Sequence, residues 1–65
     1  MHYLIFYDIS STKTRNQVST YLESVGHRMQ KSVFLVNAST AVWKTIQRDL
    51  ARLAPNGDVL TVPVT

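Results

Sequence analysis

The 65-residue sequence contains no cysteine, which excludes disulfide bonds and thiolate metal sites. It has no apolar run near the ~20 residues that a helix needs to cross a bilayer. A chain this short forms one domain, and such a domain buries only about 60% of the surface that its unfolded chain exposes. A bound metal ion or association with another chain is then the remaining way to stabilise it.

Acidic residues are also scarce. Four Asp and Glu stand against seven Lys and Arg, which gives a net charge of +3 and a pI near 9.7. This excess favours a polyanionic partner, above all nucleic acid, although a basic surface kept for solubility fits as well. The N-terminus lacks the pattern of a signal peptide, because one histidine precedes the apolar run and no small-residue cleavage site follows. We therefore expect a cytoplasmic protein without a membrane partner.

The first half of the chain predicts a strand and then a helix. Residues 3–10, YLIFYDIS, are typical of a buried strand that ends in a carboxylate. A polar cluster follows, and an apolar stripe with helical spacing predicts a helix from about Thr12 to Val25. Gly26 stands where a left-handed C-terminal residue is wanted. The stripe consists of Val18, Tyr21, Leu22 and Val25.

The middle segment, residues 27–38, is rich in β-branched and aromatic residues. It contains no Gly, Pro or Asn-Gly that would mark a turn. Two interpretations therefore stay open: one kinked strand, or two short strands that meet near Phe34 and Leu35.

The second half predicts another helix and a last strand. Ser39 is a good N-cap, and a second stripe runs to the breaker at residues 55–57. Residues 58–65 alternate as a strand, and Pro63 places that strand at a sheet edge because proline donates no ladder hydrogen bond. The stripe consists of Trp43, Ile46, Leu50 and Leu53.

If the middle segment is two strands, residues 1–65 form one α+β domain of the ferredoxin-like βαββαβ plan. Its antiparallel sheet carries both helices on one face, and the first strand is central. The other face needs cover, and a second copy of the chain is the simplest candidate. We therefore expect a homodimer.

The charge at the end of the first strand raises the question of its role. Alternation places Leu4, Phe6 and Asp8 on one side of that strand. If this side is the uncovered one, a two-fold dimer brings two Asp8 carboxylates together, where a Mg²⁺ ion could bind them and act on a phosphodiester. The alternative is that Asp8 caps the turn at residues 10–12.

Lys13 and Arg15 fall in the first turn of the predicted helix, where the helix dipole disfavours cations. They concentrate positive charge beside free backbone N–H groups, which suits an anion such as a phosphate. The alternative is two solvated surface residues.

Two more groups of side chains are candidates for nucleic-acid contacts. In an extended strand, alternate residues from position 28 share a face and combine a cation, hydrogen-bonding groups and an aromatic ring. The opposite row would then face the helices. The first row is Arg28, Gln30, Ser32 and Phe34, and the opposite row is Met29, Lys31 and Val33.

On the second helix, Lys44, Arg48 and Arg52 recur every four residues and form a basic ridge opposite the Trp43 stripe. The ridge could follow a nucleic-acid backbone or be a solvated face only. We expect Trp43 to belong to the core, and His2 and His27 to be structural.

These residues resemble the second CRISPR-associated protein family over essentially the whole chain. The resemblance lies in Y-D-I at residues 7–9, Arg15, H-R-M-Q-K-S-V-F at 27–34 and, less closely, V-L-T-V-P-V at 59–64. Members are small ferredoxin-like homodimers, described as metal-dependent endoribonucleases or deoxyribonucleases. They also serve as the non-integrase subunit of the complex that inserts spacers into a CRISPR array.

The resemblance implies that Asp8 ligates Mg²⁺ at the dimer interface. It implies further that a homodimer binds DNA or RNA and scaffolds the CRISPR integrase subunit, with metal-dependent endonuclease activity as a second function. The residues that it places around the active cleft are Tyr7, Arg15, Arg28, Ser32 and Phe34.

The sequence departs from the family in two ways. Many relatives carry a second basic residue two positions after the helix arginine, where this chain has Gln17. Members are also generally longer, so this sequence could be truncated at its C-terminus. The tail that it lacks often pairs across the dimer or docks the integrase. A toxin-like ribonuclease of the virulence-associated D type, which resembles the same fold, is the alternative function.

Overall fold

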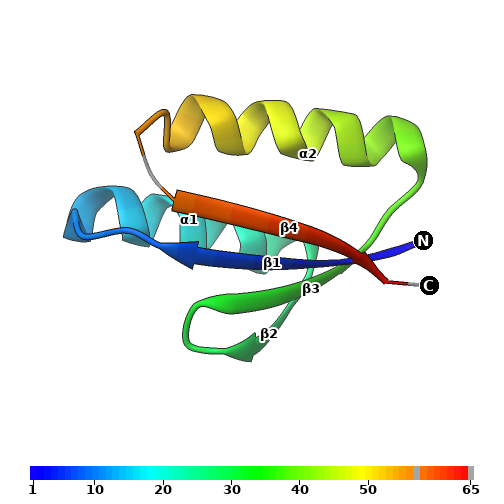
Figure 1. The fold of residues 1–65 in the computed structure, drawn as a ribbon, viewed down its shortest axis with the longest axis horizontal. Helices are drawn as coiled ribbons and strands as arrows, with labels where there is room; N and C mark the ends of the chain where they lie inside the picture. The colour runs from blue at the N-terminus through cyan, green and yellow to red at the C-terminus, as the bar shows by residue number, and fades with distance from the viewer. Residues whose placement is uncertain (57, 65) are drawn as a thin grey trace.

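The computed structural model describes residues 1–56 and 58–64 and has the predicted order of elements (Figure 1). Gly57, part of the expected helix breaker, and Thr65 lie outside the described residues. Neither described helix is long and apolar enough to cross a membrane. The elements are β1 (His2–Asp8), α1 (Thr12–Val25), β2 (His27–Gln30), β3 (Val33–Asn37), α2 (Thr40–Leu53) and β4 (Asp58–Val64).

The four strands form one antiparallel sheet in the order β2-β3-β1-β4. As predicted, β1 is central and β4 lies at an edge, where Pro63 can be accommodated opposite Tyr3. The middle segment is two strands, which decides between the two interpretations of residues 27–38. The fold is therefore the ferredoxin-like α+β arrangement.

Serine caps begin both helices. The Ser11 side chain accepts a hydrogen bond from the Thr14 N–H, and the Ser39 side chain accepts one from the Val42 N–H, each at 3.3 Å. These bonds satisfy backbone donors that have no partner within the helix. Both apolar stripes face inward as predicted, and the fully buried Val18 and Leu22 anchor α1.

The core lies between the helices and one face of the sheet. The alternate residues of β1 that point to this face are buried, and the Tyr3 ring stacks on Trp43 with the ring centroids 3.8 Å apart. Trp43 is thus a core residue, as expected. The other members of this face are Ile5, Tyr7 and Ile9 from β1 and its continuation, and Phe34 and Val36 from β3.

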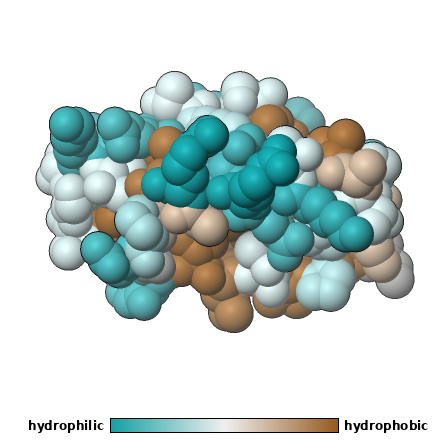
Figure 2. Space-filling view, turned by 90° about the horizontal axis from the view of Figure 1, so that it is seen from above, coloured by the Kyte–Doolittle hydropathy of each residue, from teal (hydrophilic) through white to brown (hydrophobic). Residues whose placement is uncertain are grey.

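The opposite face of the sheet, which we call the open face, carries no helix. Phe6 is exposed here, and Leu60, its cross-strand neighbour on β4, is 63% exposed. Figure 2 looks down on α2, where hydrophilic side chains gather, and shows apolar surface along the lower side, which faces the viewer in Figure 1. The open face is therefore apolar although nothing in one chain covers it.

Two expectations for the middle segment were wrong. The turn lies at Lys31 and Ser32, not near Phe34, which pairs with Arg28 inside the hairpin. The row expected to face the helices was also wrong. The row that contains Phe34 faces them, because Phe34 is fully buried while Met29 of the opposite row is 56% exposed. A register shift between Arg28 and Gln30 interrupts the alternation on which the expectation rested.

Gly26 follows α1 for a reason that was not expected. Its backbone is extended, with φ −155° and ψ −163°, so no left-handed conformation is required. A Cβ at this position would lie 2.5 Å from the Leu35 carbonyl oxygen and 2.8 Å from the Val36 Cγ2 atom. Glycine is needed because the chain passes directly against β3.

Candidate functional site

A groove of about 420 Å³ opens where the end of β1, the first half of α1 and the β2–β3 turn meet. It gathers three cationic side chains, one carboxylate and several hydrogen-bonding groups from three segments within the first half of the chain. Five of the candidate residues meet here: Tyr7, Asp8, Arg15, Arg28 and Ser32. The remaining lining residues are Ile9, Asn16, Ser19 and Lys31.

Asp8 ends β1 at the mouth of the groove with an exposed side chain. Its cross-strand partner on β4 is Asp58, so two carboxylates lie opposite each other in one chain. Directly opposite residues have Cβ atoms about 4.5–5.5 Å apart, and like charges there repel. Within residues 1–56 and 58–64, the helix cap is Ser11 and Asp8 makes no side-chain hydrogen bond, so the turn-capping alternative finds no support.

The donor set at this position fits a hard divalent cation. Mg²⁺ takes one or two carboxylates and keeps several waters, so the exposed Asp8 carboxylate beside Asp58 offers suitable ligands. The described part of the chain contains no cluster of three or more acidic, histidine or cysteine ligands. One chain therefore provides part of a coordination shell only.

Arg15 links the end of β1 to α1. Its Nη1 donates to the Ile9 carbonyl oxygen at 3.0 Å, and its Nη2 donates to the Thr12 hydroxyl at 3.3 Å. These two bonds leave three of the five guanidinium donors for a ligand. Arg15 thus lies in the first turn of the helix, beside Asp8, as its spacing predicted.

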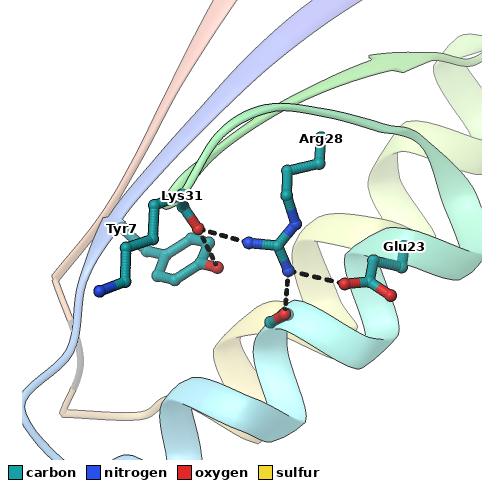
Figure 3. A network of polar contacts seen from close by, with 5 residues as sticks. Tyr7, Glu23, Arg28 and Lys31 are labelled. Atoms are coloured by element: carbon teal, nitrogen blue, oxygen red, sulfur yellow. Dashed lines mark hydrogen bonds and ion pairs between the residues drawn. The ribbon is translucent and has the colours of Figure 1, made fainter.

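Arg28 is held by three acceptors from two directions (Figure 3). Its Nη1 donates to the Lys31 carbonyl oxygen, and its Nη2 donates to the Ser19 hydroxyl and the Glu23 carboxylate, each at 2.6 Å. The hydrogen bond to Glu23 is the main cause that raises the pKa of the Arg28 guanidinium further above its ordinary value. The network ties the β2–β3 turn to α1.

Phe34 does not line the groove. It is fully buried, and the Arg28 guanidinium carbon lies 4.8 Å from the centroid of its ring. A direct contact of Phe34 with nucleic acid would require an exposed ring, so that expectation was wrong, and Phe34 lies beneath Arg28 as a platform for its guanidinium.

Tyr7 belongs mostly to the core and reaches the groove with its hydroxyl. The ring packs near Phe34, with centroids 6.2 Å apart, and the hydroxyl donates to the Lys31 carbonyl oxygen at 3.3 Å. The Tyr7 N–H also donates to the Ser32 carbonyl oxygen at 3.2 Å. β1 therefore holds the turn that carries Lys31 and Ser32.

The other cationic candidates lie outside the groove. Lys13 is exposed on α1 and does not line it. Lys44, Arg48 and Arg52 are exposed along α2, and Arg52 contacts the Asp49 carboxylate at 3.4 Å. The structure therefore separates two basic regions, the groove and the α2 ridge.

Sequence reasoning missed several residues of this site. Arg15, Ser19 and Glu23 recur every four residues, so they share a helix face beside the apolar stripe, and this spacing could have revealed the face that meets Arg28. Lys31 was expected to face the helices. Asp58 gave no local signal, because only the pairing of β1 with β4 brings it to Asp8.

Comparisons with known proteins agree with this fold. Residues 1–65 match the family model described as "CRISPR associated protein Cas2". A crystal structure of the hypothetical protein TT1823 from Thermus thermophilus gives a TM-score of 0.90 at 27% identity, over 98% of this chain and 80% of that one. A crystal structure of Streptococcus pyogenes Cas2 at pH 6.5 gives 0.89 at 21% identity, over 100% and 87%. A search of curated proteins finds no match.

Proposed function

The chain belongs to the CRISPR-associated protein Cas2 family, and from this premise we propose that it is a homodimeric, nucleic-acid-binding subunit that scaffolds the integrase during spacer acquisition. The observation that carries the proposal is the match of all 65 residues to the family, joined to an apolar open face and a basic exterior. Family membership also favours this function over that of a toxin-like ribonuclease.

The open face supports association with a second copy of the chain. Several large apolar side chains are exposed together on this face. Large exposed apolar patches on a monomer often mark an interaction site. A small domain also gains most from added buried surface. The exposed apolar residues that β1 and β4 contribute to this face are Phe6, Leu60 and Val62.

The distribution of charge supports nucleic acid as the partner. The groove presents free donors of Arg15, and the α2 ridge presents Lys44 and Arg48, which the structure describes without an acidic partner. Cations on two regions of each chain would let a dimer contact a polyanion at several points. Each neutralised phosphate releases counterions, so such binding weakens steeply with salt.

The test combines the state of association with function. We expect a dimer in analytical ultracentrifugation, and a loss of spacer insertion with the partner integrase when Lys44 and Arg48 are both changed to glutamate. A protein that stays monomeric at the concentrations that support insertion would contradict the dimer. Unchanged duplex binding in the double variant would limit the ridge to a solvated face.

A second candidate function is metal-dependent phosphodiester hydrolysis, which the exposed Asp8 beside Asp58 favours. These carboxylates would hold Mg²⁺, which when bound supplies Lewis-acid polarisation of a phosphate and activation of water. Arg15 would neutralise charge on the same phosphate through its free donors.

The two functions respond differently to Asp8→Ala. Nuclease activity in the presence of Mg²⁺ should disappear, whereas spacer insertion should persist because scaffolding needs no metal ligand. Loss of both activities together, with dimerisation intact, would show that Asp8 serves the assembly itself. Nuclease activity that survives in the variant would exclude Asp8 as its metal ligand.

A further inference from the structure

We propose that Lys31 is the residue of the β2–β3 turn that contacts the phosphodiester backbone, and that Arg28 is a positioning residue that holds Lys31 in place. The inference rests on the proposed binding of nucleic acid and deepens it. It reverses the usual expectation that an arginine in a groove is the phosphate ligand.

Three of the five N–H donors of Arg28 are already in use. A guanidinium can grip a phosphate with either of two parallel pairs of N–H groups, and both pairs include Nη2. Both hydrogens of Nη2 are committed, one to the Ser19 hydroxyl and one to the Glu23 carboxylate, each at 2.6 Å. A bidentate contact with a phosphate would therefore require Arg28 to release one of these partners.

Two further contacts fix the plane of this guanidinium. Its carbon lies 4.8 Å from the centroid of the buried Phe34 ring, and its Nη1 donates to the Lys31 carbonyl oxygen at 2.6 Å. The Glu23 carboxylate also offsets the positive charge at close range. Arg28 is thus bound on several sides by its own chain, which suits a structural clamp.

Lys31 has a fixed backbone and a free side chain. Its carbonyl oxygen accepts hydrogen bonds from both Arg28 and the Tyr7 hydroxyl, so two elements hold the turn at this residue. The side chain is exposed and points away from Arg28 (Figure 3). Among the residues that the structure describes, its ammonium group forms no ion pair, and Lys31 lines the groove. A mobile point charge on an anchored turn is suited to a phosphate.

The test is the salt dependence of binding, which counts phosphate contacts. The probes are a short labelled single-stranded RNA and a short labelled DNA duplex, titrated at several salt concentrations. Lys31→Gln should reduce affinity and lower the slope of log K against log salt by about 0.7 for the single strand or 0.9 for the duplex. Lys31→Arg keeps the charge and should retain both values, which makes it the matched control.

Arg28→Gln distinguishes the two roles, because it removes both the clamp and the charge that a direct phosphate contact would use. A glutamine side chain cannot span the three acceptors, so the turn should loosen and affinity should fall several-fold. The salt slope should stay unchanged, because a structural role does not alter it, whereas loss of a direct phosphate contact would lower it as in Lys31→Gln. The Arg28→Gln chain can be checked for folding by its circular dichroism.

Two results would overturn the inference: an unchanged slope in Lys31→Gln, or a lowered slope in Arg28→Gln. The second would return the phosphate contact to Arg28. If the wild-type chain binds neither probe at any salt concentration, the proposed function itself fails, which is a different outcome from these two. The probe that shows the slope change identifies the preferred nucleic acid.

Discussion

The two faces of the sheet are built from the same strands but differ in how far one chain buries their apolar side chains. On the helix-covered face, alternate residues of β1 are buried, and Ile5 is fully enclosed by residues of its own chain. On the open face, the intervening residues Leu4 and Phe6 are also apolar, yet they remain half-buried or exposed. One chain therefore buries the apolar side chains on only one side of its central strand.

This difference separates stability from association. Burial of apolar surface on the covered face contributes the free energy that folds one chain, at about 25 cal/mol per Å². The same chemistry on the open face yields a comparable gain only when another surface covers it. Substitutions on the two faces should consequently affect two different measurements, and the predictions below follow from this division.

The largest effect should come from the covered face. Ile5→Ala should lower the free energy of unfolding by about 2–5 kcal/mol, because it leaves a cavity in a closely packed core. Urea denaturation at several protein concentrations measures this change. Leu4→Ala, its neighbour on the open face, is the matched control: its cost should grow as the concentration rises, since association stabilises the folded chain. If the loss of stability in Leu4→Ala were the same at every protein concentration, the two faces would not differ in the way described.

On the open face, a charge should act on association instead of folding. Leu60→Glu should raise the dissociation constant of the proposed dimer by a factor on the order of 10–100, because the dimer would bury an unpaired carboxylate. In one chain Leu60 is 63% exposed, so the fold should survive. Sedimentation velocity measures the shift to monomer. Thr20→Glu on the exposed side of α1 adds the same charge elsewhere, and an equal shift there would argue against the open face.

Beneath the covered face, the two helices are joined by a bond that should break at high pH. The Tyr21 hydroxyl donates to the Asp49 carboxylate at 2.7 Å, and burial, together with this bond, raises the pKa of Tyr21 from 10.0 to about 12. A raised pKa contributes stability that is fully present below pH 10 and is lost as the pH rises to about 12. Tyr21→Phe should cost about 1 kcal/mol at neutral pH.

Unfolding midpoints of the wild type and Tyr21→Phe, compared across this pH range, test the assignment. The difference between the two proteins should stay constant up to pH 10 and disappear toward pH 12. A difference that is independent of pH would mean that the lost contact is packing of the ring edge and not the hydrogen bond.

The smallest effect concerns the acids at the end of the open face. Asp8→Asn should stabilise the chain by about 0.2–1 kcal/mol, because it removes the repulsion between Asp8 and Asp58. Asp58→Asn should give a similar gain, and the double variant should add little to either. Thermal unfolding without Mg²⁺ measures this gain. The same measurement with Mg²⁺ shows whether a bound cation relieves the repulsion in the wild type and so reduces the difference. Additive gains would show that the carboxylates do not interact.

The sequence alone predicts those parts of the fold that depend on short-range patterns. The stripe from Val18 to Val25 and the cap-forming Ser39 are local signals, so both helices lie where they were expected. The alternation along β1 likewise identifies its two faces. Pro63 correctly indicates the edge strand because the loss of a backbone donor is a property of the residue itself.

Features that depend on the register of the strands were missed or wrong. The turn at Lys31 and Ser32 contains no glycine or proline, and the shift after Arg28 changes which side chains meet the helices. The candidate groove shows the same limit. Its Arg15 was found from a local pattern and its Tyr7 only through the family resemblance, whereas the acceptors of Arg28 come from α1 and from the β2–β3 turn and meet only where the hairpin packs on the helix.

The position of β2 beside β3 depends on the missing Cβ atom of Gly26. Because a methyl group there would overlap the Leu35 carbonyl oxygen, Gly26→Ala must push the departing chain away from β3. The displaced segment is the one that enters β2 two residues before Arg28. A substitution that touches no ligand would therefore displace the strand that carries Arg28, so the close approach of Gly26 to β3 also constrains the alignment of the groove.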